Sequence, residues 1–315
     1  MSQSLTIWYI TDNKPGHLNQ LKGLAQQLNH RSNQAGFQLN EHWITYNSPK
    51  LNWRSLFGKK PDIASANAPS MVIGAGHKTH LKLLAVGLKF NAYTAVLMRP
   101  SLPLNLFDAA IIPEHDRPPR RRNILETRGV LNTVQPKERK ESSQKSQNGL
   151  MLVGGESKHY LWNSEQIINQ INEILNQEPS IQWTLSNSRR TPAEFLGQLN
   201  TIKPKNLRIV DCEQTDANWL PHQIDNASKV WVSPDSVSMV YEAITSGSPT
   251  GLFTLPIQKI NRINSGIQQL VQEKMVTEFA QWESHKELTE PAQSLWESDR
   301  AAKWLLEQFQ QNQSQ

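Results

Sequence analysis

The chain has 315 residues, of which 37% are hydrophobic and 19% are charged. This length is enough for two domains that each bury a core of their own, and this composition excludes a chain that stays disordered. The single cysteine, Cys212, excludes an intramolecular disulfide framework and fits a reducing compartment. No apolar run reaches the length of a membrane span, and no signal-peptide pattern begins the chain. We therefore expect a cytoplasmic protein.

The formal net charge is only +5, so the location of the positive charges matters more than their sum. Arg117, Arg120, Arg121 and Arg122 form a cluster that is typical of a solvated surface. The same cluster would also attract an anionic membrane surface or an acidic lipid-linked acceptor, which would place the protein peripherally on the inner face of the cytoplasmic membrane. No nucleic-acid-binding module accompanies it, so we expect no nucleic-acid partner.

Apolar runs that alternate with amphipathic segments predict an α/β fold. The first run, SLTIWYI, has the β-branched and aromatic composition of a buried strand, and HLNQLKGLAQQLNH after it has apolar residues at helical spacing. The same alternation continues to residue 116 and starts again after residue 148, which indicates two parallel sheets wrapped by helices. Strands are expected in the runs 4–10, 38–46, 69–75, 93–101, 108–116, 149–157, 180–188, 206–212, 229–234 and 249–256.

One segment lacks apolar residues altogether. Residues 135–149, QPKERKESSQKSQNG, are therefore the predicted linker. They separate an N-terminal domain, 1–134, from a C-terminal domain, 150–290. The tail from residue 287 has a helical pattern, and its helix, 291–310, is expected to complete the first domain.

The segment SPDSVSMVYEAITSGSP, residues 233–249, joins a strand to a helix that begins near Ser236. Helix N-termini attract phosphate through unpaired N–H groups and a positive dipole end, and Ser236 and Ser238 add hydroxyl donors there. Asp235 is the expected N-cap of this helix. Glu242, further along the helix, could accept both hydroxyls of a ribose. By spacing alone, this segment is a capped helix that ends at a glycine.

Part of this segment, EAITSGSP, resembles the EA-x-x-x-G-x-P motif of GT-B-type glycosyltransferases, in which the glutamate holds the ribose of the donor and the helix start faces the diphosphate. Together with TDNKPGH, VGGESKHYLW and SNSRRTP, the whole segment resembles the family named for a plant mitochondrial-fission factor. The bacterial members of that family are described as candidate glycosyltransferases. The resemblance implies two Rossmann-like domains that face each other across a cleft, with the donor bound mainly by the second domain.

The segment TDNKPGH places His17 at the start of the first helix, directly after a strand. It is similar in position to a glycine-rich loop ending in Gly-His of the carrier-lipid-linked N-acetylglucosaminyltransferases, although only Gly16 of the glycines is kept. There the loop lines the acceptor side, which implies an acceptor-side role for Lys14 and Gly16. His17 could take the proton of an acceptor hydroxyl, with Asp12 as the reserve candidate. Equally, either residue could cap the helix.

Two further loops follow strands of the second half. Gly154 and Gly155 permit close approach of the backbone to a diphosphate, and Ser157 and Lys158 could contact it. A plain turn explains the same glycines.

Past the next strand lie the arginines of SNSRRTP. Arg189 or Arg190 could neutralise a departing nucleoside diphosphate without a metal. Sequence does not decide between them, and an exposed loop arginine is the simpler alternative.

Two motifs do not support other functions. VIGAGHKTH has Thr79 in place of the third glycine of a dinucleotide fingerprint. His77 and His80 have no carboxylate or cysteine that completes a metal set, and no DxD sequence is present. We therefore expect neither a metal nor a cofactor.

The leading hypothesis is a metal-independent transfer of sugar from a nucleoside diphosphate sugar, favoured as the UDP type, to a cell-envelope acceptor of the lipopolysaccharide type. The alternatives are a sugar-nucleotide epimerase and a non-catalytic peripheral membrane protein that acts through its arginine cluster.

Overall fold

The computed structural model describes residues 4–51, 68–137, 147–202, 205–216, 218–293 and 295–314. The chain divides into two compact units, one formed by residues 1–133 with 297–315 and the other by residues 134–296. Residues 138–146, the middle of the predicted linker, lie outside the described residues.

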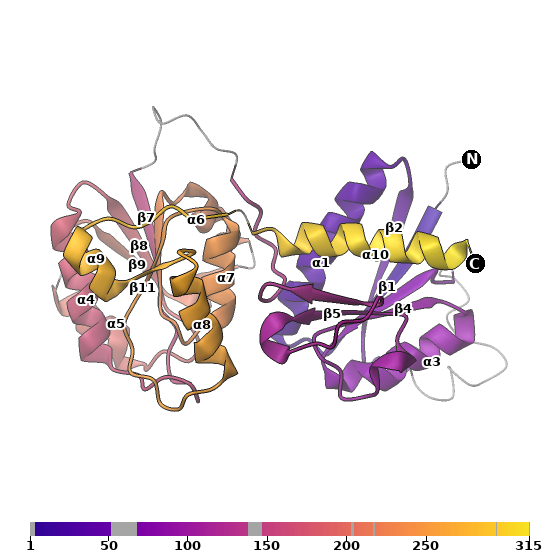
Figure 1. Ribbon diagram of the computed structural model, residues 1–315. Coiled ribbons are helices and arrows are strands. Elements are labelled where there is room, and N and C mark those ends of the chain that lie inside the picture. The colour runs from indigo at the N-terminus through magenta and orange to yellow at the C-terminus, as the bar shows by residue number, and fades with distance from the viewer. Residues whose placement is uncertain are drawn as a thin grey trace. The chain divides into compact units, whose positions relative to one another are not determined.

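The first unit is a parallel sheet of six described strands with helices on both faces (Figure 1). The strand order is β2-β1-β3-β4-β5-β6, and every neighbouring pair is parallel. Its elements are β1 (Ser4–Thr11), α1 (Pro15–Gln34), β2 (Gln38–Thr45), β3 (Met71–Ala75), α3 (His80–Phe90), β4 (Tyr93–Leu97), β5 (Ala109–Pro113), β6 (Ile124–Thr127) and α10 (Glu297–Gln313).

Alternation along β1 explains why this sheet is covered on both faces. Ile7 and Tyr9 belong to the core that includes leucines of α1 and α10, whereas Trp8 and Ile10 belong to the core that includes α3. All four side chains are fully buried. Successive strand residues point to opposite faces, so an apolar run without polar alternation can only be satisfied between two helical layers.

The C-terminal helix α10 packs against α1 in the first unit. Arg31 Nε donates to Asp299 Oδ1 at 2.8 Å, and Ser298 Oγ donates to the carbonyl of Asn132 at 2.6 Å. The predicted start of this helix at residue 291 is wrong, because α10 begins at Glu297. Pro291 lacks a backbone donor, and the acidic side chains of Glu297 and Asp299 are stabilised in a first helical turn.

The second unit repeats this plan with the strand order β12-β11-β10-β7-β8-β9, again parallel throughout its described residues. Its elements are β7 (Asn148–Leu152), α4 (Ser164–Gln177), β8 (Gln182–Ser186), α5 (Glu194–Ile202), β9 (Leu207–Val210), α6 (Trp219–Asn226), β10 (Lys229–Val232), α7 (Val237–Thr245), β11 (Thr250–Leu252), α8 (Arg262–Gln272), β12 (Thr277–Glu278) and α9 (Phe279–His285).

A cluster of aromatic rings stabilises the second sheet. Trp231 of β10 is fully buried, and its ring centroid lies 5.3 Å from that of Trp282 in a T-shaped arrangement. The rings of Phe253 and Phe279 also pack against Trp231. Edge-on and tilted rings at this separation contribute attraction beyond the area that they bury. This packing holds β10 and β11 in place, and the loop and helix that follow β10 carry part of the predicted donor site.

Candidate functional site

Each sheet reverses its strand order at one point. In the first sheet the chain leaves β1 toward β2 and returns to β3 on the other side of β1; in the second, it leaves β7 toward β8 and returns to β10. Ligands of open α/β sheets bind at such switch points, outside the carboxyl ends of the two strands. The loops after β1 and β3, and those after β7 and β10, are therefore the places to look for function.

The loop after β1 pairs two residues that the sequence offers as alternatives. His17 Nδ1 lies 2.9 Å from Asp12 Oδ1, which also accepts the backbone N–H of Lys14 at 3.2 Å. The side chain of Asp12 is 1% exposed and that of His17 is 21% exposed. Lys14 is the N-cap of α1, with no side-chain capping bond, so neither residue caps the helix. Of the two side chains, only that of His17 reaches solvent.

Electrostatics fixes the direction of this hydrogen bond. Burial raises the pKa of Asp12, but hydrogen bonds from His17 and Lys14, with their positive charges, lower it below its ordinary value of 3.8. Asp12 is therefore an ionised acceptor at neutral pH, and His17 Nδ1 must be the donor. In the neutral imidazole the other nitrogen, Nε2, is then left as a proton acceptor. The pair has the geometry of an oriented general base.

Gly76, in the loop after β3, packs closely against the side chains of Asp12 and His17. Its φ is +91°, and a Cβ built there would lie 2.5 Å from His17 Nδ1 and 2.7 Å from Asp12 Oδ2. Thr79, which is fully buried, donates its hydroxyl and its backbone N–H to the Gly76 carbonyl at 2.7 and 2.9 Å. The segment VIGAGHKTH thus has a part in the site that the sequence does not suggest. By contrast, Gly16 has open space around it, and both Gly16 and Lys14 are exposed.

In the second unit, the loops after β7 and β10 are joined by hydrogen bonds. Gly154 N donates to Ser233 Oγ at 2.7 Å, and Gly155 N donates to Asp235 Oδ2 at 2.9 Å. A Cβ on Gly154 would lie 2.1 Å from Asp235 Oδ2, and one on Gly155 would lie 2.1 Å from the Arg190 carbonyl. Both glycines are needed for close packing, and their N–H groups are already used within the loop. These two N–H groups are therefore not free to bind a ligand, and the glycines determine the shape of the loop instead.

Asp235 is not the N-cap of α7, which corrects the expectation from sequence. The N-cap is Ser236, and the Asp235 carboxylate is buried under the glycines, where it pairs with Arg190 at 2.9 Å. Arg190 also donates to the carbonyls of Glu156 and Gly155, at 2.8 and 3.3 Å. Arg190 therefore stabilises the loop that contains Gly154 and Gly155.

The neighbouring Arg189 is placed differently. It is exposed, and among the described residues it makes no hydrogen bond and no ion pair. Burial raises the pKa of the Cys212 thiol, as does Asp211, and the charge of Arg189 partly offsets this rise. The structure thus separates two arginines that the sequence leaves equivalent, and Arg189 is the one available to a ligand.

The start of α7 remains open to a ligand. Ser236 makes no side-chain capping bond, and the first turn contains no acidic residue. The first N–H groups of a helix have no partner within it, so this turn offers backbone donors beside the hydroxyls of Ser236, which is buried, and Ser238, which is exposed. Glu242 is buried and lies one turn beyond Ser238 on the same face of the helix.

Two other predicted donor contacts fall in the loop after β7. Ser157 Oγ accepts the backbone N–H groups of His159 and Tyr160 at 3.2 and 3.1 Å, which closes a turn. Lys158 is exposed. The same loop is tied to the loop after β11, because Leu161 N donates to the Pro256 carbonyl at 2.8 Å. The loops after β7, β8, β10 and β11 therefore form one connected edge.

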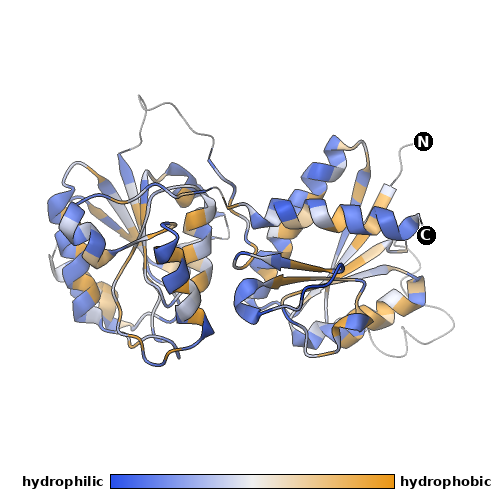
Figure 2. Cartoon of the chain, in the orientation of Figure 1, coloured by the Kyte–Doolittle hydropathy of each residue, from blue (hydrophilic) through white to orange (hydrophobic). Residues whose placement is uncertain are grey.

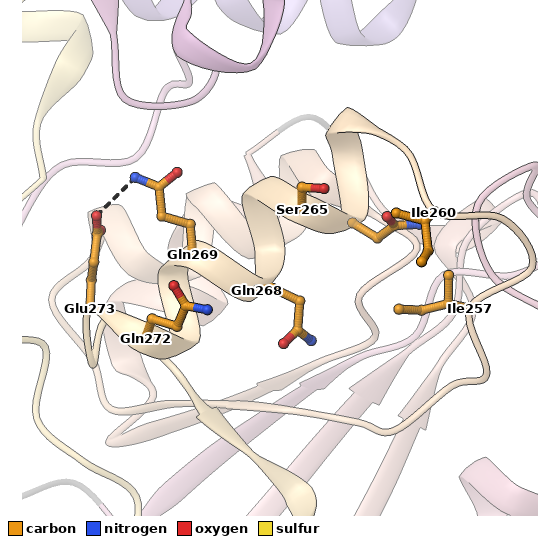
Figure 3. Close-up of a pocket in the computed structure, with 8 residues that line it drawn as sticks. Ile257, Ile260, Ser265, Gln268, Gln269, Gln272 and Glu273 are labelled. Carbon is orange, nitrogen blue, oxygen red and sulfur yellow. Dashed lines mark hydrogen bonds between the residues drawn. The ribbon is translucent and has the colours of Figure 1, made fainter.

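A polar groove of about 630 Å³ lies along α8, next to this edge (Figure 3). Two of the glutamine side chains that line the groove already donate hydrogen bonds within the protein. Gln269 Nε2 donates to Glu273 Oε1 at 2.9 Å, and Gln268 Nε2 donates to Glu278 Oε1 at 3.0 Å. Among the described residues that line it, Glu273 alone carries a charge. The groove therefore does not suit a diphosphate.

The arginine cluster of the first unit surrounds a smaller hollow. Arg120, Arg121 and Arg122 are exposed and line about 360 Å³ with Glu126. Arg122 donates to the side chain of Gln311 in α10 at 2.8 Å. Arg117, also exposed, has a left-handed backbone with φ of +49°. Within the described ranges, no helix is both long and apolar enough to span a membrane, and no three His, Cys, Asp or Glu side chains could hold a metal ion.

Comparison with solved structures agrees with this architecture. The chain superposes on UDP-GlcNAc 2-epimerase from Methanocaldococcus jannaschii with a TM-score of 0.61 at 12% identity, covering 96% of this chain and 100% of the other. The enzyme of the same name from Neisseria meningitidis, solved with UDP-GlcNAc bound, gives 0.61 at 10% identity, covering 98% and 100%. At such identities the likeness concerns the fold, which is of the GT-B-like type with two Rossmann-like units.

Sequence comparison identifies the family. An uncharacterized protein of Rickettsia prowazekii (strain Madrid E) is 26% identical over 325 aligned positions, which cover 87% of this chain and 90% of the relative. The model of the family described as mitochondrial fission ELM1 matches residues 15–309. The matched range spans nearly all of the chain and includes His17, Gly76, Gly154 and α7. The chain therefore belongs to the mitochondrial fission ELM1 family.

Proposed function

We propose that the second unit binds a nucleoside diphosphate sugar and that the first unit activates the hydroxyl group of an acceptor, so that the protein is a metal-independent glycosyltransferase. The observation that carries the proposal is the uncapped start of α7 at the switch point between β7 and β10. Backbone donors, serine hydroxyls and a helix dipole converge there, and this is the arrangement that binds a diphosphate.

Each donor contact follows from the chemistry of its residue. The diphosphate contacts the first turn of α7 through Ser236 and Ser238, and Arg189 neutralises the charge that develops on the leaving group. Glu242 accepts the ribose hydroxyls. Solved proteins of this fold carry UDP-GlcNAc or UDP, which supports a UDP-type donor.

The chemical step uses the pair in the first unit. His17 Nε2 takes the proton of the acceptor hydroxyl as its oxygen attacks the anomeric carbon, and Asp12 stabilises the imidazolium that forms. The bond between the anomeric carbon and the diphosphate oxygen breaks, and the nucleoside diphosphate leaves with that electron pair. The proton held by His17 then passes to solvent.

Isothermal titration with UDP and with other nucleoside diphosphates tests the donor half of this proposal. Wild type is expected to bind UDP, and Glu242→Ala to bind it about tenfold or more weakly, because a charged hydrogen-bond acceptor is lost. Glu242→Gln, which keeps the size of the side chain, controls for misfolding, and Glu283→Ala, an exposed site of the same unit, should bind as wild type does. If no nucleotide binds wild type, the proposal is wrong.

The likeness to UDP-GlcNAc 2-epimerases supports a second candidate, a sugar-nucleotide epimerase that uses the same donor site. The two reactions differ in their need for an acceptor. NMR of a purified donor incubated with the protein alone separates them, since an epimerase converts the sugar without an acceptor and a transferase does not.

We also propose a role for the arginine-lined hollow. Arg120, Arg121 and Arg122 present exposed guanidinium groups around one concave surface, which suits the anionic head of a lipid-linked acceptor or of a membrane lipid at the inner face of the cytoplasmic membrane. Replacing all three with glutamine should weaken sedimentation with anionic liposomes. Retained binding would count against this surface.

A further inference from the structure

Helix α3 carries two leucines that the first unit leaves in solvent. Leu81 is 58% exposed and Leu88 is 83% exposed. They are seven residues apart, which is two turns, so both lie on one face of the helix. Leu83 and Val86 are fully buried in the core and satisfy the contact of α3 with the sheet. The exposed leucines are therefore a second apolar stripe, and Figure 2 shows hydrophobic residues along much of α3.

A stripe of positive charge runs beside these leucines. Lys82 and Lys89 each follow one of the leucines by a single position, and they too are two turns apart. Lys82 Nζ donates to the carbonyl of Leu51, and Lys89 Nζ lies 5.9 Å from the centre of the Phe90 ring. Lys78, just before the helix, is exposed. Helix α3 itself contains no aspartate or glutamate.

We propose that this surface, formed by Leu81, Leu88, Lys78 and Lys89 and called here the leucine face, docks on an anionic lipid surface. A single exposed leucine is ordinary, but protruding leucines beside lysines, without acidic residues, are the combination used by helices that lie in a membrane interface. The leucines enter the boundary of the acyl chains, and the lysines stay among the head groups.

A lipid surface fits the leucine face better than a protein partner does. A stable protein interface usually buries about 800 Å² on each side with good complementarity of shape. The leucine face instead offers only two strongly exposed leucines on one helix, and none of its four residues lines either of the two hollows described above. The proposal concerns attachment and does not depend on sugar transfer.

Co-sedimentation of the full chain with vesicles tests the leucine face. Wild type should bind vesicles of mixed phosphatidylcholine and phosphatidylglycerol better than vesicles of phosphatidylcholine alone. The variant Leu81→Gln/Leu88→Gln should lose about tenfold or more in binding, because it cannot insert apolar side chains. With Arg120, Arg121 and Arg122 also replaced by glutamine, which removes the other basic surface, Lys78→Gln/Lys89→Gln should lose the remaining preference for the anionic vesicles and most of the salt dependence.

Ile260→Gln is the matched control, because Ile260 of the second unit is 83% exposed, the same fraction as Leu88. It should bind vesicles as wild type does, and thermal melting should show that all variants are folded. The proposal is overturned if the leucine variant binds like wild type or if wild type binds neither vesicle. A wild-type dimer that the leucine variant converts to a monomer would also overturn it, in favour of self-association.

Discussion

His17 Nδ1 lies 2.9 Å from Asp12 Oδ1, at the first switch point of the chain. The aspartate is buried and held ionised by the hydrogen bonds that lower its pKa, whereas the imidazole is partly exposed. One residue therefore orients the base, and the other is the base. An imidazole held by a carboxylate in this way is fixed in one tautomer.

The first prediction concerns that tautomer and the reaction that it serves. Long-range ¹H–¹⁵N correlation spectra should show neutral His17 protonated at Nδ1, and Asp12→Asn should disturb this state. With an acceptor present, His17→Ala should lower the rate of UDP release from a UDP-sugar by about a hundredfold or more, because a general base is removed. UDP affinity should be unchanged. An Nε2–H tautomer in wild type would contradict the assignment.

The second prediction concerns stability against pH. The folded pKa of Asp12 lies below its ordinary value of 3.8, so its ionised form stabilises the folded chain. That contribution is full above the unfolded pKa and is lost as pH falls through the lower, folded pKa. Asp12→Asn should therefore lower the free energy of unfolding by about 1–2 kcal/mol at pH 7, and by progressively less below about pH 4.

Urea unfolding of wild type and variant across this pH range measures the difference. Glu307→Gln, at an exposed site of the same unit, should change stability little at any pH in the range. A stability difference for Asp12→Asn that grows as the pH falls would show that the carboxylate is not stabilised by its partners.

The third prediction uses two glycines of the first unit. Gly76→Ala should displace His17 and destabilise the fold, because its Cβ would meet the imidazole at 2.5 Å and its φ is +91°. The expected cost is about 1–3 kcal/mol. Gly16→Ala, where a Cβ meets nothing within 4 Å, should leave stability and the His17 spectrum unchanged. Equal melting temperatures for Gly76→Ala and wild type would show that Gly76 does not pack closely against His17.

Much of the fold could be predicted from the sequence. Each long apolar run, such as SLTIWYI, became a parallel strand, because only a strand between two helical layers buries every side chain of such a run. Elements with few apolar residues were not predicted. Strand β12, Thr277–Glu278, has only two residues, and α6, Trp219–Asn226, buries only Ile224 among its residues, so neither gives a periodic signal.

The site was only partly predictable, because its contacts join residues far apart in the chain. Asp12 and His17 could be named as candidates from their position after a strand. The contact of Gly76 with them depends on β3 lying beside β1, and strand order is not written in local periodicity. Asp235 looked like a helix cap by its spacing, but its ion pair with Arg190 depends on the loop after β8.

The last prediction separates the two arginines of SNSRRTP. Arg190→Ala removes the cation from Asp235, whose side chain is 0% exposed, and so leaves a buried carboxylate without its ion-pair partner. Such a loss should destabilise the second unit by about 2–4 kcal/mol, visible as a lower melting temperature. Arg189→Ala should melt as wild type does but bind UDP about tenfold more weakly. Because the two sites are adjacent and the substitution is the same, each variant is the control for the other. Weaker UDP binding by Arg190→Ala at temperatures where it is folded, with normal binding by Arg189→Ala, would exchange their roles.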